Sequence, residues 1–389
     1  MKLIVLSAFY FPDEIGGAEI STRILCENLV SKGHEVTVIT MGTTPDKSQG
    51  EMISGVKVLR LNSTYRSRYD AQNEKGNISK VIWHINCDTG NYVPDSFDLI
   101  VQKIQPDWAI VSQTSGFGAL IIPRLKNLGT KVVVFNRDYY YLNLDVSNSS
   151  KRMFDLRYYV GLLLSLRRRL QLNKSNLAVA NSVYLRDKLQ DACLIKQKVH
   201  VLYTDNPTWK VMKRRFASKE KYELLFCSKL ETTKGTEILL RLIKTLPSNF
   251  RFTILGNGMD YEEIDHALRV RNNGRILGWV SSEECESYFE KADIFLQLSV
   301  WGEPFSRTIL EAFTKGVFVC ATSVGGNVES LDGDRGFLFD HMKEEILIRF
   351  LSEIKDHISF CNEAIRRSYE YLETRRGSSG VGGLLKLIS

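Results

Sequence analysis

Residues 301–329 read WGEPFSRTILEAFTKGVFVCATSVGGNVE, and they set the pattern for the fold. The segment 307–315 is rich in residues that favour helices, and the apolar, partly β-branched run 317–321 predicts a buried strand after it. Two carboxylates stand eight residues apart, with Glu303 in the loop before the helix and Glu311 in its second turn. The stretch therefore predicts a glutamate-bearing loop, a helix and a strand that follow an earlier buried strand.

The side chains of this loop and helix leave two interpretations. The first backbone N–H groups of a helix attract an anion, and the hydroxyl of Ser306 can cap them. The Glu311 carboxylate can accept two hydrogen bonds from a diol. In isolation, two solvated glutamates on a surface helix explain the spacing better, so the rest of the chain decides between the two.

The composition is that of a soluble globular protein with room for two domains. The chain has 389 residues, 43% apolar and 25% charged, and no apolar run has the length of a membrane span. The apolar opening, residues 1–14, lacks a small-residue cleavage site, so we expect a buried strand there and not a signal peptide. Seven cysteines without C-x-x-C spacing favour a reducing cytoplasm and argue against a zinc site.

A basic helix is predicted over residues 151–173, in a chain whose net charge is +7. Leucines at 162–164 and 166 supply apolar surface between the cations, a pattern typical of a helix that lies on an anionic bilayer. A basic solvated helix that packs its leucines into the domain would have the same sequence. No nucleic-acid-binding module surrounds it, so we expect no nucleic-acid partner. The cations are Lys151, Arg152, Arg157, Arg167, Arg168, Arg169 and Lys174.

The first half of the chain opens with a β-α-β pattern. A strand over 2–8 is followed by Gly16 and Gly17, an amphipathic helix over 18–32 and a second strand over 35–40. Open parallel sheets bind ligands at the carboxyl ends of their strands, which is where this glycine pair lies. A Gly-Gly pair is more often only a turn, and the absence of G-x-G-x-x-G argues against a dinucleotide site.

A second candidate ligand position follows the strand predicted over 131–135. Arg137, Asp138 and Tyr139 come directly after it, with two more tyrosines behind them. This again is the carboxyl end of a parallel strand. Tyrosines there either stack on a sugar or pack into the core, and the sequence does not choose between the two.

The second half repeats the βα rhythm after a break at Asp205-Asn206-Pro207. We expect an N-terminal Rossmann-like domain over 1–206 and a second over 207–357. In the second domain Lys229 and Lys234 follow the first strand, and Gly256 and Gly258 follow the next. Two ammonium groups match a pyrophosphate. With the acidic loop and helix, they predict a site for a nucleotide-diphosphate sugar.

Taken together, these segments resemble the retaining nucleotide-sugar glycosyltransferases of family 4. Residues 9–40 (FYFPDEIGGAEISTRILCENLVSKGHEVTVIT) are similar to the family's glycine-loop opening, and 228–235 (SKLETTKG) to its G-R-L-x-x-x-K-G segment. Residues 302–329 resemble its E-x7-E signature of the E-P-F-G-R type. The resemblance implies the α/β GT-B fold, with two Rossmann-like domains facing across a cleft and residues 358–389 crossing back to the first domain.

The resemblance also implies roles for individual residues. Glu303 would lie by the hydroxyls of the donor sugar, Glu311 would bind the ribose, and Val280 would lie near the nucleobase. Catalytic roles fall to Glu303, Lys234 and Arg137, and acceptor contacts to Asp138 and Tyr139. No metal or other cofactor is implied, and the leaving diphosphate would take the proton of the acceptor. The implied donor-binding residues are Gly17, Lys229, Lys234, Gly256, Val280, Glu303, Phe305, Ser306 and Glu311.

Three positions depart from the family pattern. Arg137 replaces a histidine that usually touches the donor sugar, and an arginine there could hold a phosphate or an acidic acceptor instead. Lys229 replaces an arginine and loses its planar fork. Ser306 replaces a glycine and adds a side chain where the backbone approaches the ligand.

The resulting hypothesis is a cytoplasmic glycosyltransferase, peripheral on the inner face of the cytoplasmic membrane. Its acceptor would be a saccharide or a lipid-linked molecule, in surface polysaccharide or glycolipid biosynthesis. Two alternatives stay open: a soluble enzyme that makes a small glycoside, and a non-catalytic GT-B subunit that stabilises a true transferase.

Overall fold

The computed structural model divides the chain into two compact units. The first comprises residues 1–206 and 377–389, and the second residues 207–376. The structure describes residues 1–13, 16–42, 50–63, 65, 85–89, 92–142, 156–203, 210–375 and 380–389, with backbone alone for 156–160. Helix α14 (Ile358–Arg375) belongs to the second unit. The part of the chain that returns to the first unit is therefore shorter than the segment 358–389 expected from the sequence.

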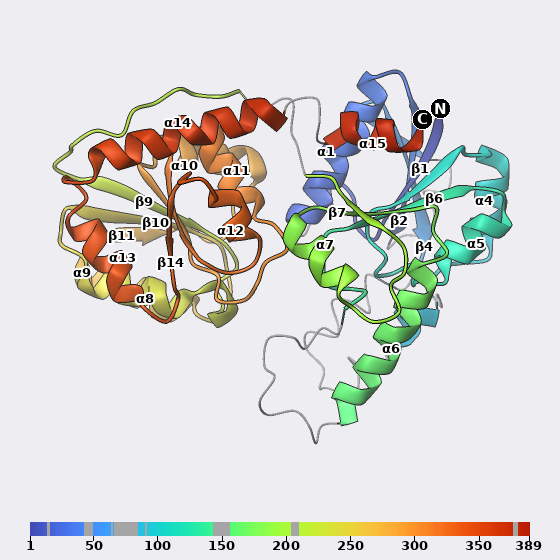
Figure 1. The fold of residues 1–389 in the computed structure, drawn as a ribbon, viewed down its shortest axis with the longest axis horizontal. Helices are drawn as coiled ribbons and strands as arrows, with labels where there is room; N and C mark the ends of the chain where they lie inside the picture. The colour runs from blue at the N-terminus through green and yellow to red at the C-terminus, as the bar shows by residue number, and fades with distance from the viewer. Residues whose placement is uncertain are drawn as a thin grey trace. The chain divides into compact units, whose positions relative to one another are not determined.

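The first unit is built on an eight-stranded sheet in the order β3-β4-β2-β1-β5-β6-β7-β8 (Figure 1). Neighbouring strands are parallel except for β3, which is antiparallel to β4. The predicted opening strand is confirmed as β1. The strands are β1 (Lys2–Ser7), β2 (Glu35–Gly42), β3 (Glu51–Ile53), β4 (Val56–Asn62), β5 (Trp108–Val111), β6 (Lys131–Asn136), β7 (Leu177–Ala180) and β8 (Val199–Val201).

Helices cover both faces of this sheet because the buried strands are apolar on both sides. Along β1, Leu3 and Val5 pack into one core cluster with α1 and α15, while Ile4 and Leu6 pack into the other with α4, α5 and α7. Alternate residues of a strand point to opposite faces, which produces this division. The helices are α1 (Gly17–Ser31), α4 (Ser96–Ile104), α5 (Ile121–Asn127), α6 (Leu156–Leu172), α7 (Val183–Gln190) and α15 (Gly380–Ile388).

The second unit has a six-stranded, fully parallel sheet in the order β11-β10-β9-β12-β13-β14. Its strands are β9 (Tyr222–Cys227), β10 (Phe250–Leu255), β11 (Gly274–Ile276), β12 (Ile294–Gln297), β13 (Phe318–Thr322) and β14 (Phe337–Phe339). The 3₁₀ turn η1 spans Thr232–Lys234, and the helices besides α14 are α8 (Thr236–Thr245), α9 (Tyr261–Arg271), α10 (Ser282–Lys291), α11 (Arg307–Thr314), α12 (Gly326–Leu331) and α13 (Glu344–Ser352). The predicted α/β fold with two Rossmann-like units is thus confirmed.

No helix within the described ranges combines the length and hydropathy that a membrane crossing requires. In the first unit, α15 packs against α1, so the C-terminal residues cover the face on which the β-α-β opening lies. In the second unit, α14 packs against α11 and β13. The stretch 301–329 therefore sits under a long helix, which fixes the elements that carry its acidic residues.

Candidate donor-binding site

In the second unit, the order in which the chain adds strands to the sheet reverses between β9 and β12. From β9 it adds β10 and β11 on one side, and later β12, β13 and β14 on the other. Loops that leave the carboxyl ends of two such strands part from each other and open a crevice for ligands. The loop 228–235 follows β9, and the loop 298–306 follows β12. The predicted donor residues of both loops therefore converge on the switch point.

An ion pair between Lys234 and Glu303 forms the centre of this site. The Nζ atom of Lys234 lies 2.7 Å from Oε1 of Glu303, and the hydroxyl of Ser299 donates to the same oxygen at 2.5 Å. The two charged side chains are 21% and 16% exposed, so they are partly screened yet reachable. Nζ of Lys234 also lies 5.5 Å from the ring centre of Trp301. Two of the three predicted catalytic residues thus lie in contact.

Glycine 325 and its neighbour hold the backbone of the acidic loop. The N–H of Gly326 donates to the carbonyl of Glu303 at 2.7 Å. Gly325 has a φ of +55°, and a Cβ atom there would lie 2.5 Å from that carbonyl oxygen. Only glycine fits such a close approach. The Gly-Gly turn that follows β13 therefore positions Glu303, a role that the sequence pattern did not reveal.

Lys229 lies outside the central pair. Its ammonium group is 2.8 Å from the carboxylate of Glu231, and its side chain is 68% exposed. Burial alone would raise the pKa of Glu231, but hydrogen bonds from Lys229 and Thr233 outweigh it and lower that pKa overall. Lys229 is therefore an exposed cation at the rim of the loop, and its predicted contact with a diphosphate stays a prediction.

Helix α11 begins at Arg307, with Ser306 at its N-cap position. The Ser306 hydroxyl contacts that of Thr308 at 3.0 Å and accepts no hydrogen bond from the helix backbone. The capping role considered for this side chain is therefore wrong, because the hydroxyl is buried against another hydroxyl. The backbone N–H groups at the start of the helix keep their capacity for an anion.

Glu311 is held by a residue that the sequence analysis overlooked. Nη2 of Arg307 lies 2.5 Å from Oε1 of Glu311, one helical turn away. The Nε and Nη1 atoms of Arg307 are buried and have no hydrogen-bond partner among the described residues. The i,i+4 spacing of an arginine and a glutamate was the available signal. The pair thus places the Glu311 carboxylate beside buried guanidinium N–H groups that have no partner among the described residues.

The remaining predicted donor residues have mainly structural partners. Gly256 has a φ of +136°, and a Cβ atom there would lie 1.8 Å from the carbonyl oxygen of Ser228. Position 256 therefore requires glycine because the backbone of Ser228 lies so close to it, whether or not a ligand is bound. Val280 and Phe305 are half-buried against the apolar cluster beneath α10 and α11. Their contacts with a ligand stay predictions.

The first unit carries its own predicted residues around the carboxyl ends of β1, β5 and β6. Gly17 is exposed at the start of α1. The guanidinium group of Arg137 donates to the hydroxyl of Ser112 and, at 3.2 Å, to that of Thr22. It also lies 4.1 Å from the ring centre of Phe135, and burial lowers its pKa to about 10. Arg137 is thus anchored within its own unit.

Asp138 and Tyr139 lie beside Arg137 at this edge. The Asp138 carboxylate accepts the N–H of Tyr140 at 2.9 Å, and desolvation by the surrounding protein raises the pKa of this carboxyl group. Tyr139 is half-buried, whereas Tyr140 and Tyr141 are buried in the core. Of the two interpretations of the tyrosines, packing is therefore correct for the last two.

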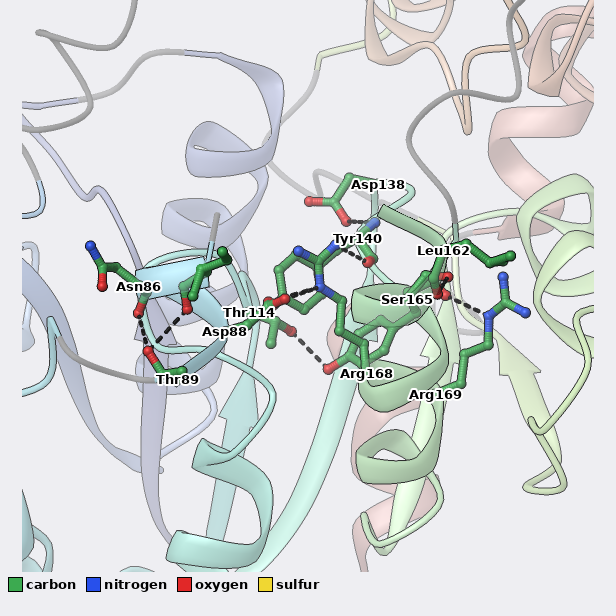
Figure 2. Close-up of polar contacts among 12 residues, drawn as sticks. Asn86, Asp88, Thr89, Thr114, Asp138, Tyr140, Leu162, Ser165, Arg168 and Arg169 are labelled. Atoms are coloured by element: carbon green, nitrogen blue, oxygen red, sulfur yellow. Dashed lines mark hydrogen bonds and ion pairs between the residues drawn. The ribbon is translucent and has the colours of Figure 1, made fainter. Parts of the chain in front are cut away.

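Two arginines of helix α6 bind the backbone of the loop after β6 (Figure 2). The Nε atom of Arg168 donates to Asp88 at 2.8 Å, and its Nη1 atom donates to the carbonyl of Tyr140 at 2.9 Å. Arg169 donates to the carbonyl of Tyr141 at 3.0 Å. Both arginines are buried. The exposed basic face of α6 is therefore narrower than the sequence predicts, because two of its arginines are buried. Residues 151–155 of the predicted helix lie outside the described part of the chain.

Two family models match consecutive parts of the chain. Glycosyltransferase Family 4 matches residues 15–204, and Glycosyl transferases group 1 matches residues 207–370. An uncharacterized 42.6 kDa protein in the cps region of Klebsiella pneumoniae is 27% identical over 334 residues, which cover 85% of this chain and 87% of the relative. An uncharacterized glycosyltransferase of Methanocaldococcus jannaschii is 27% identical over 361 residues, with 85% and 82% covered.

Solved structures of glycosyltransferases have the same fold. Sucrose-phosphate synthase from Thermosynechococcus elongatus has a TM-score of 0.75 at 13% identity, with 100% of this chain and 98% of that chain covered. Anabaena HepE, solved in complex with UDP-glucose, has a TM-score of 0.67 at 15% identity, with 99% of each chain covered. The family models together span almost the whole chain, and the chain belongs to glycosyltransferase family 4, with the GT-B fold.

Proposed function

We propose that this glycosyltransferase moves a sugar from a nucleotide-diphosphate donor to a saccharide or lipid-linked acceptor, with retention of the anomeric configuration and without a metal. The observation that carries the proposal is the Lys234–Glu303 pair at the switch point, with Arg307 and Glu311 on the adjoining helix. A cation beside a carboxylate can serve a phosphate and a sugar hydroxyl at once. The second pair can serve the diol of a ribose.

In this proposal each group has a defined task. Lys234 neutralises the donor diphosphate, assisted by Lys229 and by the first N–H groups of α11. Glu303 accepts hydrogen bonds from hydroxyls of the donor sugar. As the bond from the anomeric carbon to the diphosphate breaks, the two lysines and the N–H groups of α11 stabilise the negative charge that develops on the leaving oxygen. That oxygen takes the proton of the acceptor hydroxyl while the acceptor oxygen bonds to the anomeric carbon on the face that the diphosphate leaves.

The relatives support a place in surface polysaccharide assembly. One relative is encoded in the cps region of Klebsiella pneumoniae. WaaG, described as involved in lipopolysaccharide biosynthesis, has a TM-score of 0.64 at 14% identity, with 96% of this chain and 95% of that chain covered. HepE was solved with UDP-glucose. A cytoplasmic enzyme that extends a saccharide or a lipid-linked acceptor fits these relatives.

Peripheral contact with an anionic membrane belongs to the same proposal. Leu163 and Leu170 are 67% and 49% exposed and lie on one face of α6, with the exposed Arg167 between them. Apolar and basic residues on one face favour a membrane surface. Sedimentation with vesicles of anionic and of neutral lipid tests this point. The proposal requires binding to the anionic vesicles and its loss in Leu163→Glu/Leu170→Glu.

The donor site is tested by thermal shift with UDP, GDP, ADP and their sugars, each with and without magnesium. A ligand that binds only the folded state raises its melting temperature. We expect one nucleotide to stabilise the protein equally with and without metal. Lys234→Ala should abolish the shift, whereas the matched control Lys244→Ala, exposed on α8, should retain it. A shift that requires magnesium would contradict the metal-free mechanism.

The alternatives give different results. A non-catalytic subunit would not turn over a donor, so slow donor hydrolysis by the pure protein that is lost in Glu303→Ala excludes it. A soluble glycoside synthase would be fully active on a small acceptor without vesicles and would be indifferent to changes in α6. Retention is tested directly by NMR of the anomeric proton in the first product formed.

A further inference from the structure

A second pocket lies in the second unit, at the amino ends of the strands and not at the switch point. Its volume is about 280 Å³, and it is bounded by β9, β10, β11 and the end of α10. The donor residues all follow the carboxyl ends of strands, so none of them contributes to this pocket. The polar and aromatic residues that line it are Glu223, Arg251, Thr253, Arg275, Tyr288 and Lys291.

The register of the sheet explains why these side chains converge. Glu223 is paired with Arg251, and Thr253 is paired with Arg275. Directly paired residues of parallel strands point to the same face, as do residues two apart in one strand. All four therefore share the face on which α10 packs. That helix covers β9 and leaves this face of β10 and β11 open, so the polar side chains border a hollow.

The charges around this pocket are unbalanced. Arg251, Arg275 and Lys291 are exposed and form no ion pair among the described residues, unlike Lys234, Arg307 and Arg168. Arg275 and Lys291 each lie 5.8 Å from the ring centre of Tyr288, so both cations border the same aromatic side chain. Glu223 supplies the one carboxylate of the lining. A concave surface with an excess of one charge attracts ions of the opposite charge.

We propose that this pocket binds an acidic sugar, that is, a monosaccharide unit that carries a phosphate or a carboxylate. The three cations match the acidic group. The carboxylate of Glu223 and the hydroxyl of Thr253 accept hydrogen bonds from sugar hydroxyls. Tyr288 supplies a ring face for the C–H groups of the sugar. The volume is near the lower end of small-ligand sites, which suits a single sugar unit.

The site is separate from the donor site, so its test does not depend on transferase activity. Glucose 6-phosphate, glucuronate, glucose and inorganic phosphate are titrated into the full chain by calorimetry at low salt. We expect one of the two acidic sugars to bind at least about tenfold more tightly than glucose and than phosphate, since both halves of the ligand contribute. Which of the two binds shows whether the acidic group of the ligand is a phosphate or a carboxylate.

Three variants assign the binding to the pocket. Arg251→Gln/Arg275→Gln should weaken it at least about tenfold, and both residues are exposed, so the fold should be retained. Lys355→Gln removes an exposed cation that forms no ion pair among the described residues, and it should leave the affinity unchanged, as should Lys234→Ala in the donor site. Tyr288→Ala should weaken binding of the acidic sugar while leaving that of phosphate unchanged.

Several results would overturn the proposal. One is that neither acidic sugar binds more tightly than glucose. Another is that Lys234→Ala removes the binding, because the ligand would then occupy the donor site. A third is that phosphate binds as tightly as the better of the two acidic sugars, because the sugar would then make no contact. The proposal would also be overturned if Arg251→Gln/Arg275→Gln left the affinity for the acidic sugar unchanged.

Discussion

Replacing Arg168 by methionine removes one partner of a buried ion pair in the first unit. Arg168 and Asp88 are 4% and 3% exposed, and the Arg168 guanidinium also holds the carbonyl of Tyr140. Removal of one partner of such a pair costs about 3–5 kcal/mol, because the other charge remains buried and unpaired. In a unit of roughly 200 residues each kcal/mol lowers the melting temperature by about 2–4 °C. We therefore expect a loss of about 6–20 °C.

Calorimetry of the full chain measures this change, and hydrogen exchange of peptides from β6 and β7 assigns it to the first unit. The matched control is Arg366→Met, since Arg366 pairs with Glu363 on the exposed face of α14. Exposed pairs contribute about 1 kcal/mol or less. The reasoning is refuted if Arg168→Met costs no more than this control. A further Asp88→Asn change should recover part of the loss, because it removes the unpaired charge.

Three further changes test the site and its supports. Gly235→Ala combines a φ of +81° with a Cβ atom 1.9 Å from the carbonyl oxygen of Leu298, so it should cost at least about 2 kcal/mol in urea unfolding; an equal cost for Gly33→Ala, which has open space, would contradict this. Arg307→Ala leaves Glu311 unpaired and should weaken nucleotide binding about tenfold by calorimetry. Burial raises the pKa of Glu19, so the folded state holds its proton to a higher pH than the unfolded state, and stability falls as the pH rises from about 4.5 through the raised pKa. Glu19→Gln should therefore gain stability relative to the natural chain across that interval, and urea midpoints that keep a constant difference with pH would exclude the effect.

The elements and the donor loops could be predicted because their signals are local. The apolar runs that became β1, β9 and β13 are short and bounded by turns, helical spacing identified α1, and alternation identified β2. Parallel strands bring their carboxyl ends to one edge, so Lys234 and Glu303 could be placed together although they are far apart in the sequence. Their direct contact follows from that topology.

What the sequence could not show depends on distant partners. Arg168 and Arg169 resemble the exposed cations around them, and only the fold brings Asp88 and two backbone carbonyls to them. The same limit applies to Gly256, whose need for a small residue comes from the backbone of Ser228. A charge pattern or a glycine in the sequence indicates that a position is restricted, but it does not identify the distant atom that restricts it.

The Lys234–Glu303 contact leads to one more prediction, which separates the two roles of the site. Without a ligand, Glu303 competes with a diphosphate for the ammonium group of Lys234. Glu303→Gln removes this competitor, and partly exposed pairs are worth up to about 1 kcal/mol, so the nucleoside diphosphate should bind about two- to fivefold more tightly. Transfer of the sugar should nevertheless be lost, because the carboxylate that accepts the sugar hydroxyls is gone.

Calorimetry with the nucleoside diphosphate and product detection with its sugar measure the two effects in one preparation. Glu263→Gln is the matched control, because it removes an exposed carboxylate of α9 that pairs with Lys244 and lies outside the donor loops. If Glu303→Gln weakened nucleotide binding as strongly as Lys234→Ala, then Glu303 would be a structural support of the lysine and not its competitor. The contact in the ligand-free state would then be part of the phosphate site itself, and the assignment of Glu303 to the sugar would have to be abandoned.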